Sequence, residues 1–154
     1  MNRNEIKRSI VDFMEFIDIG AAVSENKKKE LAKHLDQLSY ASHFLTYTFD
    51  EKEYPEFEGE DVAITRQRIE KAFPEFGLYN VPEHIDEKFG ESGTMVGDSI
   101  DDILDIYQDL KEVLWCWENT SVDNAIWTFE NSFCTHWEQH LRELQIYVCE
   151  ITRK

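Results

Sequence analysis

The sequence predicts an all-α protein, an antiparallel helical bundle of four long helices plus one or two short helices. Apolar residues recur every three or four positions along most of the chain, which is the period of an amphipathic helix. Only three prolines and six glycines occur in 154 residues, so little interrupts the helices. No segment shows the alternation of a half-buried strand. This length, with 42% hydrophobic residues, favours one domain spanning residues 1–154.

Two long helices are expected near the amino terminus. Residues 3–24 place their apolar side chains on one helical face, and Asn26 with the lysines after it marks a turn. Residues 27–49 follow as a helix with two apolar faces, which is typical of packing between neighbours or of a subunit contact. The second of these faces consists of Tyr40, Phe44 and Tyr47. These three aromatics are therefore candidates for a homo-oligomer contact.

The middle of the chain has a weaker helical pattern. Residues 50–60 form an acidic linker, and Asp61 is a plausible N-cap for a short helix that runs through Phe73. Residues 75–95 contain three glycines and one proline, which predicts a loop with one helical turn near residues 84–89. Loops of this length in compact domains are usually functional or form ordered surface coils.

The last two long helices are expected at residues 97–118 and 121–151. Ser121 is the expected N-cap of the second one. A turn this short makes two helices antiparallel neighbours. Side chains of the two segments should therefore meet along a common seam.

The composition narrows the classes of partner. The chain carries 32 acidic and 16 basic residues, a formal net charge of −16. Such a surface repels phosphate backbones and acidic lipid surfaces, so neither nucleic acid nor a membrane is an expected partner, whereas basic proteins and divalent cations remain compatible. Three cysteines without metal-type spacing, and no apolar leader at the start, favour a reducing cytoplasm.

An acidic stripe follows the segment at residues 97–118. On a helical wheel its carboxylates lie opposite the apolar face, on the expected solvent side. The stripe comprises Asp98, Asp101, Asp105, Asp109 and Glu112. It predicts a solvated face, a docking ridge for a basic partner or a cation site. Asp102 differs, because it lies at the edge of the apolar face and could turn inward.

Two histidines lie one turn apart in the last helix. On the wheel His140 falls near the centre of the apolar face, and His136 lies on its flank. An unpaired buried imidazole would cost about 1–3 kcal/mol, so His140 requires a partner. The candidates are Asp102, Tyr107, Glu130 or a backbone carbonyl. Two imidazoles at this spacing can also bind a divalent metal if a carboxylate such as Asp102 or Asp98 completes the site.

The two helices resemble an uncharacterised family of bacterial proteins, the DUF5063 proteins. The residues that carry the resemblance are Gly97-Asp98, the run from Asp101 to Lys111, Trp127, Ser132-Phe133, His136-Trp137 and His140, with Leu78-Tyr79 and Pro82 before them. It covers about residues 60–147, and the first sixty residues are similar only in helical pattern. The resemblance implies a helical fold and supplies no activity. It also implies that the acids and the histidines belong to one pattern.

Two hypotheses of function follow. The first is a cytoplasmic helical binding or adaptor protein that uses the acidic ridge and has no catalytic residues. The alternative is a metal-dependent hydrolase of a small phosphorylated or nucleotide-like substrate, because all-α enzymes of this kind use helix carboxylates to hold magnesium. The candidate metal ligands in this sequence are Asp102, His136 and His140. No cofactor is predicted, and a divalent metal is compatible with either hypothesis.

Overall fold

The computed structural model describes residues 1–86 and 88–154, and it is a mostly α-helical bundle, as the sequence predicts. The amino-terminal segment consists of α1 (Arg3–Glu15), a π-helix η1 (Phe16–Gly20) and α2 (Ala21–Val23), followed by α3 (Lys27–Ala41) and a 3-10 turn η2 (Ser42–Phe44). The central segment contains α4 (Val62–Ala72), β1 (Leu78–Pro82) and β2 (Thr94–Asp98). The carboxyl-terminal segment consists of α5 (Ser99–Asn119), α6 (Val122–Ser132), a π-helix η3 (Phe133–Trp137) and α7 (Glu138–Arg153).

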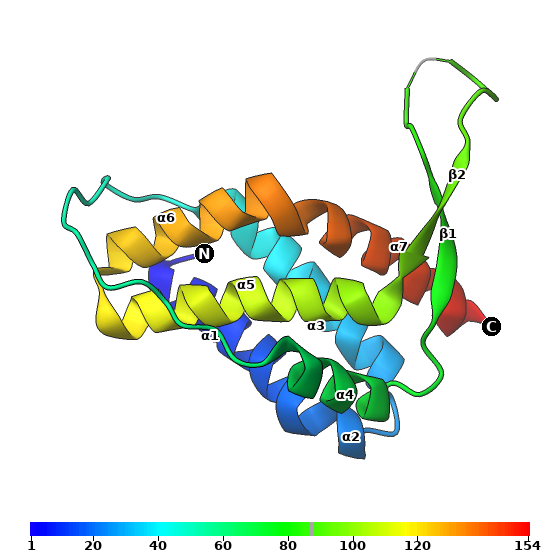
Figure 1. Cartoon of the computed structure of the whole chain (residues 1–154), viewed down its shortest axis with the longest axis horizontal. Helices are drawn as coiled ribbons and strands as arrows, with labels where there is room; N and C mark the ends of the chain where they lie inside the picture. Colours follow the sequence, from blue (N-terminus) through cyan, green and yellow to red (C-terminus); the bar gives the residue numbers. More distant parts are fainter. Residues whose placement is uncertain (87) are drawn as a thin grey trace.

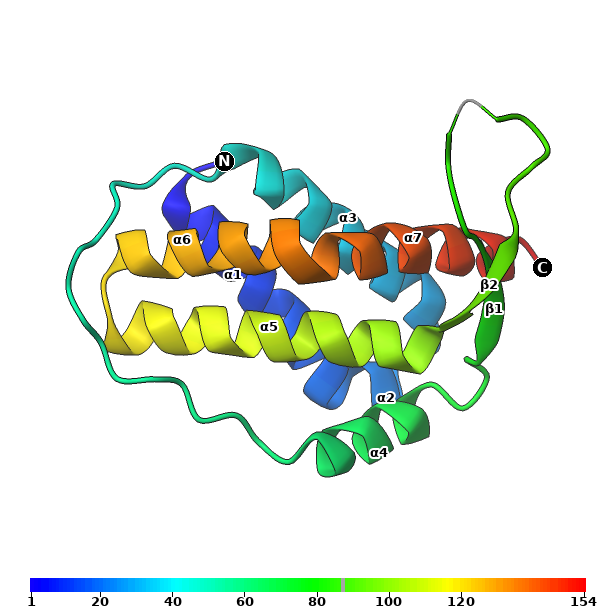
Figure 2. The same cartoon turned by 45° about the horizontal axis from the view of Figure 1, so that its top comes forward.

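Helix α5 lies at the centre of the bundle and contacts α1, α4, α6 and α7. Helices α6, η3 and α7 form one continuous rod that runs antiparallel to α5, while α3 packs against α1 and α7 (Figures 1 and 2). The two termini lie toward opposite ends of the long axis. The core contains large apolar side chains from all of these helices, with Trp137, Phe13 and Phe129 among the most deeply buried.

Local signals fix several helix ends where the sequence predicts them. The side chain of Asp61 accepts a hydrogen bond from the backbone of Ala63 at the start of α4. Ser121 caps α6 in the same way, through the backbone N–H of Asn124. Each cap satisfies a backbone donor that the first helical turn leaves free.

The second predicted helix ends earlier than residue 49. After η2 the backbone of Leu45 is extended, and the chain leaves the helix axis. Arg3 then donates to the carbonyl of Thr46, and Tyr47 donates to Glu130 of α6. The sequence from residue 46 to 49 alternates threonines and aromatics, which have low helix propensity, so these contacts prevail. Tyr47 therefore lies beyond the end of the helix and contacts α6, so it does not continue the aromatic stripe that begins at Tyr40.

The predicted loop at residues 75–95 contains two antiparallel strands, which corrects the expectation of no β-structure. Leu78 pairs with Asp98 and Pro82 with Thr94, so β1 and β2 form a hairpin that projects from one end of the bundle (Figure 1). Only Val81 in the two strands is buried, and the other strand residues are exposed or half-buried. A hairpin that buries so little of its surface needs no alternation of apolar and polar residues, and the sequence shows none.

Residue 87 lies outside the described residues, and the predicted helical turn near residues 84–89 includes it. The described residues on either side of it form bends and a turn, not a helix. Among the described residues, every helix is too short or too polar to cross a lipid bilayer.

Candidate functional site

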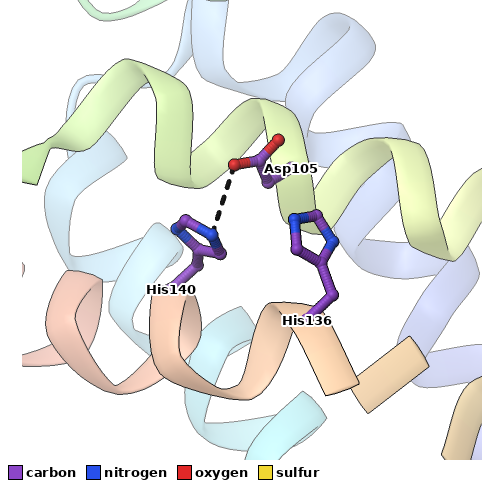
Figure 3. A group of neighbouring side chains, drawn as sticks. All are labelled: Asp105, His136 and His140. Carbon is purple, nitrogen blue, oxygen red and sulfur yellow. Dashed lines mark ion pairs between the residues drawn. The ribbon is translucent and has the colours of Figure 1, made fainter. Parts of the chain in front are cut away.

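The seam between α5 and the η3–α7 rod brings acids and histidines together. Asp102, Asp105 and Asp109 lie along one side of α5. His136 and His140 project toward this side from the end of η3 and the first turn of α7, with Asp105 opposite them (Figure 3). The spacing of the acids by three and four residues matches the four-residue spacing of the histidines. Antiparallel packing therefore places an acid opposite each imidazole.

His140 is held by the innermost acid. Its Nδ1 lies 2.8 Å from Oδ1 of Asp102, whose side chain is only 5% exposed. The hydroxyl of Tyr79, from β1, donates to the other oxygen of Asp102. The Tyr79 ring also stacks on Tyr147 of α7, with ring centroids 4.7 Å apart. The buried carboxylate thus has a partner on each oxygen, and the hairpin is tied to the site.

His136 is held by the outer acid. Its Nδ1 lies 2.6 Å from Oδ2 of Asp109. The side chain of His136 is 49% exposed and that of Asp109 is 20% exposed, so this end of the seam opens to solvent. Each histidine therefore has Nδ1 engaged by its own carboxylate, and Nε2 is the ring nitrogen on the side away from that carboxylate.

Asp105 lies between the two histidines. Its Oδ2 is 3.4 Å from Nε2 of His140, and its side chain is 24% exposed. One ligand atom from each of Asp105, His136 and His140 lies within 4.8 Å of the others (Figure 3). These three side chains form the group that could hold a metal ion. We call them the metal triad, and we call Asp102 and Asp109 the supporting acids.

The seam shifts the pKa of several groups. The hydrogen bond from His140 to Asp102 raises the pKa of His140, against the opposing effect of burial. Burial raises the pKa of Asp105, and the nearby His140 offsets part of this. Burial also raises the pKa of Asp109, with His136 acting in the opposite direction. Burial and the hydrogen bond to Asp102 raise the pKa of Tyr79, so its hydroxyl stays protonated as a donor.

The structure changes the predicted orientation of the acidic stripe. The helical wheel places Asp105 and Asp109 on the solvent side, but in the structure they are partly buried and face the histidines. The wheel is misleading here because α5 has neighbours on most of its sides. The side opposite the apolar stripe is lined by α7 and α4, and it is not left to water.

The two remaining aspartates of the stripe face α4. Asp98 caps α5 through the backbone N–H of Ile100, and its other oxygen accepts from Arg66 at 2.7 Å. Asp101 is exposed and lies 3.0 Å from the same guanidinium. Neither residue contacts the histidines, so Asp98 does not complete the metal triad. Arg66 was not singled out from the sequence.

The structure confirms Asp102 as the partner of His140, but His140 is less buried than its place on the helical wheel predicts. Asp102 turns inward and bonds the imidazole, as its place at the edge of the apolar face suggested. However, the His140 side chain is 27% exposed. Tyr107 lies elsewhere, because its hydroxyl donates to Asp18 of η1 at 2.8 Å. Asp105 replaces Asp102 as the carboxylate that could bind a metal, since Asp102 already engages Nδ1 of His140.

Sequence reasoning missed the role of Tyr79, which depends on the hairpin. It also missed the pairing of Asp109 with His136. The matched spacing of acids and histidines on two antiparallel helices was the signal that could have revealed this second pair.

The fold and the seam define a helical-bundle protein with a cluster of acids and histidines between two antiparallel helices. The chain belongs to the DUF5063 family, described as a domain of unknown function, which it matches over residues 4–146. The family match thus begins at residue 4, and it includes the amino-terminal helices that the sequence showed only as helical pattern.

A solved structure shares this fold. The chain is similar to protein BF1032 from Bacteroides fragilis, with a TM-score of 0.76 and 16% identity over 96% of this chain and 90% of that one. At this identity the likeness shows the fold alone. No curated protein matches the chain.

Proposed function

We propose that this protein binds a divalent transition-metal ion through the metal triad of Asp105, His136 and His140. The observation that carries the proposal is the hydrogen bonding of the two imidazoles. Metal-binding histidines almost always donate their other ring N–H to a carboxylate, which fixes the tautomer and the ring orientation. Asp102 and Asp109 hold both Nδ1 atoms in this way, and Asp105 lies on the Nε2 side of His140.

The donor atoms favour a particular class of metal. Imidazole nitrogen suits zinc, cobalt, nickel and iron, whereas magnesium and calcium prefer oxygen ligands alone. Two ligands on a tetrahedral zinc ion lie about 3.4 Å apart, given bonds of about 2.1 Å. The distance from Nε2 of His140 to Oδ2 of Asp105 is already 3.4 Å. His136, the most exposed of the three, would move to close the site.

The sequence favours a binding protein, and so does this proposal. The proposed ligand is a metal ion and not a basic protein. Arg66 neutralises much of the charge at Asp98 and Asp101, and Asp105 and Asp109 turn toward histidines. Docking of a basic protein partner on this stripe therefore loses most of its support. Oligomerisation through Tyr40, Phe44 and Tyr47 stays a prediction. Tyr40 is 57% exposed, whereas the Tyr47 hydroxyl donates to Glu130 within the chain.

Thermal unfolding with and without metal tests the proposal. Metal that binds only the folded state stabilises it, by about 2.7 kcal/mol when free metal is a hundredfold above the Kd. We expect zinc, cobalt or nickel to raise the Tm of chelator-treated protein, and magnesium or calcium at equal concentration to leave it unchanged. Replacing His136 or His140 by alanine should remove the effect, whereas His43→Ala, at an exposed histidine outside the seam, should retain it.

The supporting acid gives a sharper test than the ligands themselves. Asp102→Asn keeps the size of the side chain but weakens its hydrogen bond with Nδ1 of His140. Calorimetry should therefore show metal affinity reduced about 10–100-fold. Asp101→Asn removes the same charge one residue away, at a side chain paired with Arg66, and serves as the matched control. Equal losses in both variants, or unchanged zinc binding after loss of both histidines, would contradict the proposed site.

A further inference from the structure

The proposed metal triad leaves room for a further ligand on the metal. Zinc sites with three protein ligands keep a fourth position for water or substrate. The side chains of the triad are between 24% and 49% exposed, so that position would face solvent. What can enter it depends on the charges around the seam.

The charge of the seam stays negative when a dication is added. The carboxylates of Asp102, Asp105 and Asp109 contribute three negative charges, and a divalent ion supplies two positive ones, which leaves one negative charge. Glu143 acts on His140 through space and adds to the same sign. These charges lie close to the triad in a partly buried setting, where screening by water and salt is weaker than at an open surface.

Three cationic side chains on α4, α5 and α7 already have acidic partners. Arg66 binds Glu70, Asp98 and Asp101 together. Lys111 pairs with Glu60, and Arg142 pairs with Glu138. In the part of the chain that the structure describes, each of these three cations would have to leave a carboxylate before it could receive an anionic ligand.

Backbone donors offer no alternative at the seam. The first turn of α5 is capped by the carboxylate of Asp98. Helix α7 continues directly from η3, so its first N–H groups already point into helical structure. An anion usually binds at a free helix N-terminus or a basic cluster, and the seam presents neither among the described residues.

We infer that the open position of the metal site takes a neutral ligand, such as water or a neutral nitrogen donor, and disfavours anions. This rests on the metal binding proposed above. The alternative of a hydrolase for phosphorylated or nucleotide-like substrates is disfavoured for the same reason, because such substrates would bring further negative charge to a seam that keeps its own.

Cobalt-loaded protein gives the test, because the visible absorption of Co²⁺ reports changes in its ligands. Imidazole and azide are both small nitrogen donors, but imidazole is neutral above its pKa and azide is an anion. In titrations at such a pH, both ligands should change the cobalt spectrum. We expect the Kd of imidazole to be about tenfold lower than that of azide, or lower still. Azide that binds as tightly as imidazole, or more tightly, would overturn the inference.

Charge variants separate the electrostatic cause from the shape of the site. Asp109→Asn should reduce the ratio of the Kd of azide to the Kd of imidazole, because it removes one negative charge. The side-chain carbonyl of the asparagine can still accept a hydrogen bond from His136. Glu112→Gln removes a charge one turn further along α5 and should leave the preference in place. An unchanged preference in Asp109→Asn would overturn the electrostatic argument. Failure of cobalt to bind the wild-type protein at all would instead overturn the metal site, and this inference with it.

Discussion

His34 is a histidine whose environment opposes its charged form. Its ring stacks on Phe16 of η1, with centroids 4.8 Å apart, and its Nδ1 is buried without a hydrogen-bond partner among the described residues. Burial lowers the pKa of His34, and Lys33 acts in the same direction, while Asp12 and Glu30 offset part of the effect. The packed, neutral imidazole joins α3 to the amino-terminal helix.

We expect His34 to make the protein less stable in mild acid. Its folded-state pKa lies below 6.5, so the unfolded chain binds the proton first as the pH falls. The free energy of unfolding should therefore rise with pH up to about 6.5 through this group. Urea unfolding at several pH values should show a shallower rise in His34→Gln than in the wild type. His43→Gln, at an exposed histidine of η2, is the control, and an equal change of slope in both would contradict the assignment.

Individual residues of the seam differ in how far the sequence could place them. The inward turn of Asp102 and its bond to His140 follow from a local argument. Asp102 lies at the edge of the apolar face, and an imidazole on the apolar face of the next helix needs a hydrogen-bond partner. The orientation of Asp105 and Asp109 depends on which helices cover α5. That information is tertiary and does not appear in the periodicity of one segment.

The π-helix η3 determines how the histidines are presented. A π turn holds more residues than an α turn, so a wheel with a fixed step of about 100° drifts across Phe133–Trp137. Phe133 and Trp137 both stay buried, and the indole of Trp137 donates to Ser132 at 3.0 Å. His136 lies inside this segment and His140 just after it. This explains why His140, predicted at the centre of the apolar face, is partly exposed on the seam.

The hairpin is joined to the seam by a close contact at Gly97. A Cβ atom there would lie 2.6 Å from Cζ of Tyr79 and 2.9 Å from a methyl carbon of Val81. We expect Gly97→Ala to lower the free energy of unfolding by about 1–3 kcal/mol, the usual cost of overpacking. It should also weaken zinc binding, because Tyr79 would be pushed away from Asp102.

Gly77 offers a matched control for this substitution in the same region. A Cβ atom at Gly77 would have no neighbouring atom within 4 Å, so Gly77→Ala should be neutral or stabilise by about 0.4–1 kcal/mol. Urea unfolding and zinc calorimetry on both variants make the comparison. Equal stabilities would mean that the hairpin can shift without strain and does not position Tyr79.

At the scale of the whole molecule, the helices could be predicted better than their connections. The order of the helices, the antiparallel pairing of α5 with the following rod, and the caps at Asp61 and Ser121 follow from periodicity and local chemistry. The hairpin could not be predicted, because only Val81 of its strands is buried and its position depends on Tyr147. The path after η2 depends likewise on contacts with α1 and α6, far away in the sequence.

The net charge of the molecule should govern its response to salt. With 32 acidic and 16 basic residues, the folded chain confines a formal charge of −16, and self-repulsion destabilises compact states. Ion pairs such as Arg3–Asp123 and Arg8–Asp12 oppose this only weakly, since exposed pairs contribute about 0–1 kcal/mol and are screened as well.

Moderate concentrations of sodium chloride should therefore raise the Tm of the metal-free protein, because screening reduces the repulsion more than it weakens the pairs. Differential scanning calorimetry in the presence of a chelator measures this, and the chelator removes any contribution from the proposed metal site. Potassium chloride at the same ionic strength should give the same shift if screening is the cause. A fall in Tm with salt would mean instead that the ion pairs of Arg3, Arg8 and Arg66 contribute more to stability than the repulsion removes.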